Sequence, residues 1–179
     1  MAVAKRVWLD AADWKRTQKS VPIACVDVLP LRVSGSDAGL VDAVGLIRRD
    51  TPHQGRRWCL VGGRLLRNET LTEAVARQVR ETLGRGVRFD IEAAAQPAYV
   101  AQYFTFVRHI GCRDPRQHAV AMTFCVAIKG TPVPQGEAES FEWHAPTRLP
   151  PADEFGFDQD RVVKACLAKL IASGIRLAN

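Results

Sequence analysis

No apolar run in this 179-residue sequence is long enough to form a membrane-spanning helix. Such a helix needs about 20 consecutive apolar residues, and the longest apolar stretch, residues 119–128, is interrupted by Thr123. Residues 1–15 carry polar side chains where a signal peptide would have its apolar segment. These absences predict a cytoplasmic protein without a membrane partner.

The five cysteines form no C-x-x-C pair and lack the His/Cys spacing of a zinc site. Three of them, Cys25, Cys59 and Cys125, lie in apolar runs typical of strands. They are therefore predicted to be small buried side chains rather than metal ligands or disulfides, which agrees with a reducing compartment.

Long runs of basic residues are also absent, although 25 Lys and Arg residues against 19 acidic ones give a net charge of +6. A basic surface suits an anionic partner such as a nucleotide, and it is equally compatible with an ordinary solvated surface. Because the arginines are scattered and no RNA-binding aromatic motif is present, nucleic acid is not favoured as a partner.

No repeat, low-complexity stretch or linker divides the chain, so we predict one domain over residues 1–179, with residues 1–20 as an N-terminal helical extension. Strand patterns dominate the middle of the sequence, and helical patterns interrupt and end them. This order predicts an α/β (α+β) sandwich with a mixed sheet. The expected helices are 9–19, 71–83 and 157–173, and the expected strands are 21–32, 41–49, 58–61, 86–90, 98–108, 117–129 and 141–143.

Residues 62–84, GGRLLRNETLTEAVARQVRETLG, combine a double glycine with a helix that has a clear start signal. Residues 70–73 have the T-x-x-E pattern of a capping box. The spacing of Gln78, Glu81 and Thr82 places their side chains on one patch of the helix surface. Because glycine allows close approach of a ligand and Mg²⁺ prefers oxygen ligands, this segment is a candidate site for a phosphate and a hard cation.

The same segment resembles the Nudix box, G-x5-E-x7-R-E-U-x-E-E-x-G-U, in which U is aliphatic. Gln78 and Thr82 replace two of its glutamates, and Arg85 replaces the final aliphatic residue, so the box is degenerate. The resemblance implies a Nudix-type α/β/α sandwich with a central mixed sheet. The motif residues to which it implies a structural role are Gly63, Glu69, Arg77 and Gly84.

A longer run, W-x3-G-G-R-x4-E-T-L from Trp58 onward, is similar to the GDP-mannose mannosyl hydrolase branch of the Nudix family. That branch also lacks one glutamate of the box. The resemblance implies that Arg48 and Arg64 contact the diphosphate of a small-molecule nucleotide substrate. The phrase RDTPHQGRRWCLVGGR and the N-terminal helix also resemble a Nudix-like group of unknown function from actinobacteria.

Resemblance to the family further implies a bound Mg²⁺ (or Mn²⁺) and cleavage of a nucleoside diphosphate that is linked to another moiety. The Gly62 carbonyl and the Glu81 carboxylate are implied metal ligands, and Gln78 is an implied neutral ligand. Glu137, six residues before Trp143, is in the usual place of the family's distal acidic residue. It is implied as a metal ligand or general base, so catalysis is assigned to Glu81 and Glu137.

Two functions remain open at this stage. One is a Mg²⁺-dependent hydrolase of a nucleoside diphosphate derivative, with a nucleotide sugar among the candidates. The other is a Nudix-fold module that binds such a ligand without turnover, as the loss of carboxylates at Gln78 and Thr82 favours. Because Glu137-Ala138 stands where the mannosyl hydrolases carry a Gln-His pair, attack at phosphorus is at least as well supported as attack at carbon. The sequence is compatible with a monomer and with a homodimer.

Overall fold

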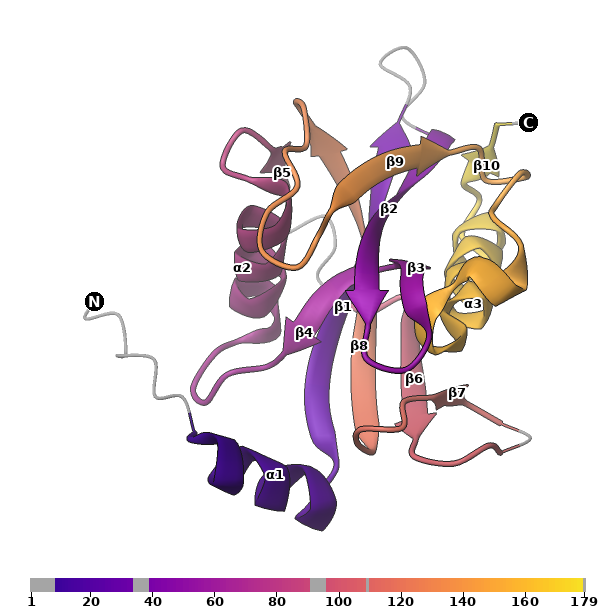
Figure 1. The fold of residues 1–179 in the computed structure, drawn as a ribbon. Helices are drawn as coiled ribbons and strands as arrows, with labels where there is room; N and C mark the ends of the chain where they lie inside the picture. Colours follow the sequence, from indigo (N-terminus) through magenta and orange to yellow (C-terminus); the bar gives the residue numbers. More distant parts are fainter. Residues whose placement is uncertain (1–8, 34–38, 91–95, 109, 179) are drawn as a thin grey trace.

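A computed structural model describes residues 9–33, 39–90, 96–108 and 110–178 (Figure 1). A strongly bent mixed sheet lies between α2 and α3, which confirms the predicted sandwich. In chain order the elements are α1 (Ala11–Ser20), β1 (Ile23–Val33), β2 (Leu40–Thr51), β3 (Gly55–Cys59), β4 (Val61–Arg64), α2 (Leu71–Leu83), β5 (Arg88–Phe89), β6 (Tyr99–Phe104), β7 (Cys112–Arg113), β8 (Ala119–Lys129), β9 (Ser140–His144), η2 (Ala152–Glu154), η3 (Gly156–Asp158), α3 (Gln159–Ala172) and β10 (Arg176–Leu177).

The sheet follows the order β10-β2-β1-β8-β6-β7, and the remaining strands pair beside this path. β3 and β9 pair with β2, β4 pairs with β1, and β5 pairs with β8. The β1–β8, β2–β10 and β6–β7 pairs are parallel, and the other pairs are antiparallel. β1 is buried over most of its length, and α2 packs against it. α3 packs against β6 and β8.

Helix α2 begins and ends at the residues that the sequence predicts. The hydroxyl of Thr70 accepts a hydrogen bond from the Glu73 amide at 3.2 Å, and the Glu73 carboxylate accepts one from the Thr70 amide at 2.8 Å. The helix ends at Gly84, whose φ of 82° is a backbone conformation that glycine adopts readily. These local signals define the two ends of the helix.

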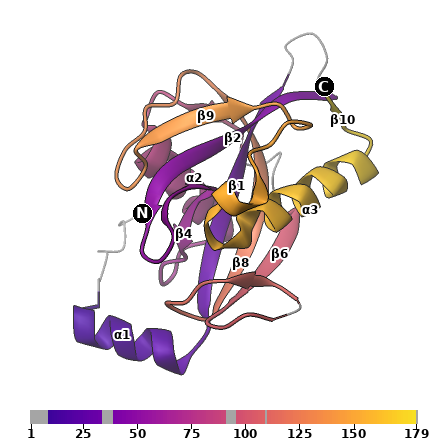
Figure 2. The same cartoon turned by 45° about the vertical axis from the view of Figure 1, so that its right-hand side comes forward.

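Helix α1 lies at the end of the sheet where β1 begins, as both views show (Figures 1 and 2). Its N-cap is Asp10, which accepts a hydrogen bond from the Asp13 amide at 2.8 Å. No residue of α1 is fully buried. The helix contacts the body of the protein through a 2.8 Å hydrogen bond between the side chains of Gln18 and Gln117 and through the partly buried Trp14.

Several expected elements differ from the structure. The double glycine, expected in a loop, lies within β4, and the single strand expected at 58–61 is divided between β3 and β4. The two-residue strands β7 and β10 were not expected, because strands so short carry no periodic signal. No helix among the described residues has the length and apolar character needed to cross a bilayer.

Candidate functional site

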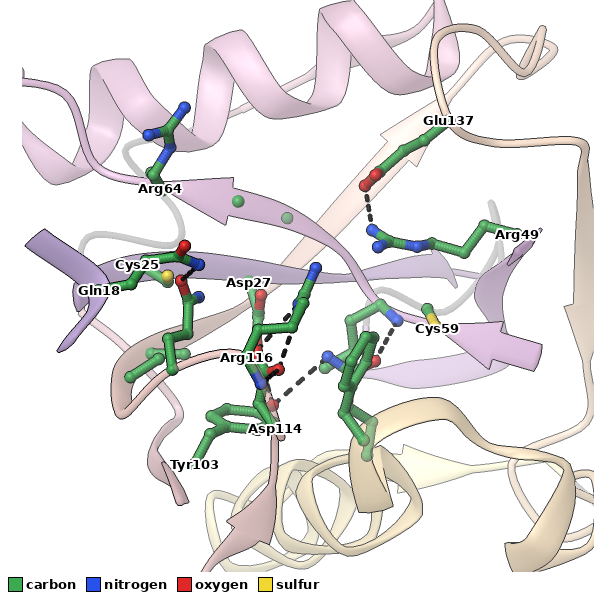
Figure 3. Close-up of a pocket in the computed structure, with 18 of the residues that line it drawn as sticks. Gln18, Cys25, Asp27, Arg49, Cys59, Arg64, Tyr103, Asp114, Arg116 and Glu137 are labelled. Atoms are coloured by element: carbon green, nitrogen blue, oxygen red, sulfur yellow. Dashed lines mark hydrogen bonds and ion pairs between the residues drawn. The ribbon is translucent and has the colours of Figure 1, made fainter. Parts of the chain in front are cut away.

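A cavity of about 350 Å³ opens over one face of the sheet (Figure 3). Alternate residues of a strand point to opposite faces, and the cavity face carries mainly small side chains, which leave room above the strands. Residues of the sheet that line the cavity include Cys25, Asp27, Gly62, Arg64, Ala119 and Ala121. Its walls come from α1, the loop before β8, η3 and the loop before β9.

The two glycines of β4 allow close packing on both faces of this strand. Gly62 pairs with Asp27 across the β1–β4 ladder, and the Asp27 carboxylate fills the space of a β-carbon at residue 62. At Gly63, a β-carbon would lie on the opposite face of β4, 2.6 Å from the side-chain amide nitrogen of Gln78 on α2. β4 therefore separates the cavity from α2.

Two arginines of the cavity wall converge on the ring of Phe157. The guanidinium carbon of Arg116 lies 4.8 Å from the ring centre, and that of Arg49 lies 5.7 Å from it. Arg116 donates two parallel hydrogen bonds to the buried carboxylate of Asp114, at 2.8 and 2.9 Å. Arg49 forms an ion pair with Glu137, whose side chain is 53% exposed (Figure 3).

A buried polar network lies beneath these charges. The Tyr103 hydroxyl donates to Asp27 at 3.3 Å, and the Gln159 side-chain amide donates to the Tyr103 hydroxyl at 3.4 Å. The carbonyl oxygen of the same Gln159 side chain accepts a hydrogen bond from the Leu60 amide at 2.9 Å. Burial raises the pKa of Asp27 to about 7, which the Tyr103 hydrogen bond and the nearby Arg49 partly oppose. Sequence reasoning missed Asp27, although an aspartate inside the apolar run VPIACVDVLPLR was an available signal.

Arg64 lines the cavity at the side of α1. Its guanidinium carbon lies 3.9 Å from the centre of the Trp14 ring, a cation–π distance. Burial lowers the pKa of Arg64, and the neighbouring charge of Arg77 acts in the same direction. The backbone carbonyl of Arg64 accepts a hydrogen bond from Arg77 at 2.9 Å. The arginine that follows the double glycine is thus positioned through both its side chain and its backbone.

An ion pair connects α2 to the segment that precedes it. Arg77 donates to both carboxylate oxygens of Glu69, at 2.6 and 2.8 Å. Both side chains are almost buried, with exposed fractions of 13% and 12%. Glu81 is 3.4 Å from Arg77 on the exposed side of the same guanidinium. Because Arg77 also contacts the Arg64 carbonyl, this pair fixes the end of β4 relative to α2.

The structure brings some of the predicted site residues together and separates others. Gly62, Arg64 and Glu137 line the cavity, whereas Glu81 and Gln78 are not among its lining residues. The loop that carries Glu137 is nevertheless joined to the last turn of α2, because the Gln135 amide donates to the Thr82 carbonyl at 2.9 Å.

Arg48 is also outside the cavity lining. Its guanidinium carbon lies 4.9 Å from the centre of the Trp58 ring, and Nη1 lies 3.6 Å from a Glu154 oxygen. The next residue, Arg49, lines the cavity in its place. Because successive residues of a strand face opposite sides, an offset of one residue moves the charge to the other face.

The residues present do not fit a resident Mg²⁺ or Mn²⁺ ion. Within the described ranges, no group of three or more His, Cys, Asp or Glu side chains could bind a metal. Glu81 and Glu137 are each engaged by an arginine, and Gln78 and Thr82 are neutral and buried. Mg²⁺ prefers an octahedron of oxygen donors, and the described side chains do not supply a cluster of carboxylates for one. The metal-ligand roles of Gly62, Gln78, Glu81 and Glu137 are therefore only a prediction from the sequence.

Solved structures show that the fold is that of the Nudix hydrolases. A possible asymmetric diadenosine tetraphosphate (Ap4A) hydrolase from Jonesia denitrificans is 30% identical, with a TM-score of 0.78 over 89% of this chain and 99% of that one. A MutT Nudix hydrolase from Burkholderia pseudomallei is 19% identical, with a TM-score of 0.60 over 82% of this chain and 98% of that one. The Nudix fold expected from the box is therefore confirmed.

The chain belongs to the family described as "Domain of unknown function (DUF4916)", which matches residues 4–172. A bifunctional NMN adenylyltransferase/ADP-ribose pyrophosphatase from Francisella tularensis, complexed with AMP and a Mn ion, is 16% identical. Its TM-score is 0.62, over 89% of this chain and 45% of the larger enzyme. No curated protein matches the sequence.

Proposed function

We propose that this protein binds a nucleoside diphosphate derivative in the cavity and hydrolyses its diphosphate linkage. The observation that carries the proposal is that Arg49, Arg64 and Arg116 line one cavity beside the double-glycine strand. Guanidinium groups bind phosphate oxygens through paired, charge-assisted hydrogen bonds. The names of the Jonesia and Francisella proteins, a possible Ap4A hydrolase and an ADP-ribose pyrophosphatase, agree with a substrate of this class.

In the reaction we propose, the three arginines bind the diphosphate and offset the negative charge that repels an attacking water. Glu137 forms an ion pair with Arg49. When a phosphate oxygen replaces Glu137 as the partner of Arg49, the Glu137 carboxylate is left free beside the reacting phosphorus. The released carboxylate accepts a proton as water forms its bond to phosphorus. The bridging P–O bond then breaks, and its electron pair leaves with the departing phosphate.

A second candidate is a module that binds the same ligand without turnover. It is favoured by the neutral side chains of Gln78 and Thr82 and by the position of Glu81 outside the cavity lining. A nucleotide sugar remains a candidate ligand for either function. The cytoplasmic location, the monomer or homodimer alternatives and the use of Mg²⁺ or Mn²⁺ are likewise proposals that rest on the sequence.

The test is a turnover screen of nucleotide sugars and dinucleoside polyphosphates with Mg²⁺, Mn²⁺ and no metal, in which phosphate-containing products are measured. A hydrolase should give product, and Glu137→Gln should remove turnover while nucleotide binding remains. Glu81→Gln should remove turnover only if the carboxylate implied by the box takes part. A module without turnover should bind ligand and give no product under any condition.

Ligand binding is tested separately through Arg64. Arg64→Ala should weaken nucleoside diphosphate binding by about tenfold or more, because a charge-assisted hydrogen bond is lost. Arg148→Ala, which removes an exposed arginine outside the cavity lining, is the matched control. Unchanged affinity in the Arg64 variant, with an unchanged melting temperature, would remove this residue from the site.

A further inference from the structure

The cavity is lined by Arg49, Arg64 and Arg116, beside the carboxylates of Asp27, Asp114 and Glu137. We propose that Arg49 and Arg116 bind the diphosphate directly, so that ligand binding does not require a divalent cation; this inference rests on the proposed function. On α2, the Gln78 side chain faces Gly63, and both Gln78 and Thr82 are neutral and buried. Positive charge to balance the phosphates is instead supplied from the opposite face of the sheet.

Arg116 is held in place by its bonds to Asp114. The Arg116 amide and Nε both donate to one Asp114 oxygen, at 3.0 and 2.8 Å, and Nη2 donates to the other at 2.9 Å. Within the described part of the chain, no hydrogen-bond acceptor of Nη1 is found. Because Asp114 fixes one edge of the guanidinium, the remaining donors are oriented before a ligand arrives, and little side-chain entropy is lost on binding.

Arg49 has an incomplete set of partners. Its side chain is only 12% exposed, and its Nε is a buried donor without an acceptor in the described residues. Its ion-pair partner Glu137 is exposed and lies at the end of a loop. Because Glu137 pairs with Nη1 of this nearly buried guanidinium, a phosphate that replaces the carboxylate takes over a charge-assisted hydrogen bond that is shielded from water.

Phe157 contacts both arginines. Its φ of 59° is in the left-handed region, which is unfavourable for a bulky residue. The Phe157 amide donates to the side-chain oxygen of Gln54 at 2.8 Å, which stabilises this conformation. The ring is nearly buried, and both guanidinium carbons lie within 5.7 Å of its centre. Figure 3 shows Arg49 and Arg116 entering the cavity from different sides.

Glu137 marks the place of a phosphate oxygen. One oxygen of the Glu137 carboxylate pairs with Nη1 of Arg49, and a phosphate oxygen can pair with the same donor. The exchange of one anion for the other leaves the charge at Arg49 balanced. The Glu137 carboxylate lies near the charges of two arginines, Arg49 and Arg116.

The experiment is calorimetry of the full chain with ADP and with inorganic pyrophosphate, in EDTA and in Mg²⁺. We expect Kd in EDTA to lie within about threefold of Kd in Mg²⁺, a difference of less than 1 kcal/mol. Binding that appears only with Mg²⁺ would overturn this inference and leave the proposed ligand class intact. Absence of binding in both buffers would overturn the inference and the proposed ligand class together.

Variants show whether these two arginines carry the affinity. Arg49→Gln and Arg116→Lys should each raise Kd by about tenfold or more in EDTA, because a charged or paired hydrogen bond is lost. Arg56→Gln, which breaks the exposed Arg56–Glu139 pair on β3, should leave Kd unchanged. Arg116→Lys keeps a positive charge beside the buried Asp114 carboxylate, so the variant should fold like the parent protein. An unchanged melting temperature confirms this. Unchanged affinity in both cavity variants would contradict the inference.

Discussion

Gly62 and Asp27 lie directly opposite each other on β4 and β1, and the Asp27 carboxylate occupies the space that a side chain at residue 62 would need. The close approach is possible because glycine has no β-carbon. It places a buried carboxyl group on the cavity floor, next to the backbone of the double glycine. The glycine that the Nudix-box comparison associates with metal binding therefore has a packing role in this chain.

A β-carbon at residue 62 should displace Asp27 and disturb the β1–β4 pairing. We expect Gly62→Ala to lower the free energy of unfolding by about 1–3 kcal/mol, the usual range for overpacking. Gly86→Ala is the matched control, since a β-carbon there would lie 3.9 Å from its nearest neighbour, the Thr131 carbonyl. Urea unfolding of both variants measures the difference, and equal stabilities would contradict this account of the glycine.

The Asp27 carboxyl makes stability depend on pH in a defined direction. Its pKa rises from 3.8 to about 7 in the folded protein, so the folded state binds the proton more tightly than the unfolded state. The stability that this protonation contributes is complete below pH 4 and is lost as the pH rises through 7, with a slope of up to about 1.4 kcal/mol per pH unit.

Asp27→Asn keeps the shape of the side chain and cannot ionise. The stability of this variant relative to the parent protein should therefore increase between pH 4 and pH 7 and level off above that range. Urea unfolding at several pH values measures it. Parallel stability curves for the two proteins across this range would show that the carboxyl does not titrate in this way.

The nearly buried pair between Glu69 and Arg77 should matter more for stability than the exposed contact between Arg77 and Glu81. Glu69→Gln leaves the Arg77 guanidinium without its bidentate partner, and we expect a loss of about 2–4 kcal/mol. Glu81→Gln removes an exposed carboxylate at 3.4 Å, and we expect a loss below about 1 kcal/mol. Thermal unfolding in the same buffer ranks the two variants, and the reverse order would contradict the assignment.

Restoring the two glutamates of the box should create a metal-responsive protein at the expense of stability. Gln78 and Thr82 are 8% exposed, so Gln78→Glu with Thr82→Glu buries two carboxylates. The double variant should melt at a lower temperature than the parent in EDTA and recover part of the difference in Mg²⁺. The parent protein should show no such recovery. Tight Mg²⁺ binding by the parent without nucleotide, measured by calorimetry, would contradict the description of its metal site.

Much of the fold could be predicted because its signals are local. The bounds of α2 follow from the capping box at Thr70 and the terminal Gly84, which are read directly from neighbouring residues. Most longer strands, such as β8, appear as apolar runs. Pairing order and parallel registers have no such local signal, and strands such as β7 exist only because a neighbour supplies their hydrogen bonds.

Less of the candidate site than of the fold could be predicted from the sequence. Arg49 and Arg48 are chemically identical neighbours on β2, and the preceding residues are buried on both faces, so no alternation indicates which arginine faces the cavity. Arg116 and Phe157 come from segments far apart in the sequence and meet only in the folded chain. A pattern search finds the box, whereas the cavity beside it depends on tertiary contacts.

Helix α1 contributes a wall of the cavity without contributing to the core. With no fully buried residue and few side-chain contacts to the body, its detachment disrupts little of the apolar packing. Its amide hydrogens should therefore exchange with solvent through local opening, far faster than those of β1 and β8. Because Trp14 is also the ring that contacts Arg64, a ligand that engages this arginine should slow exchange along the whole helix.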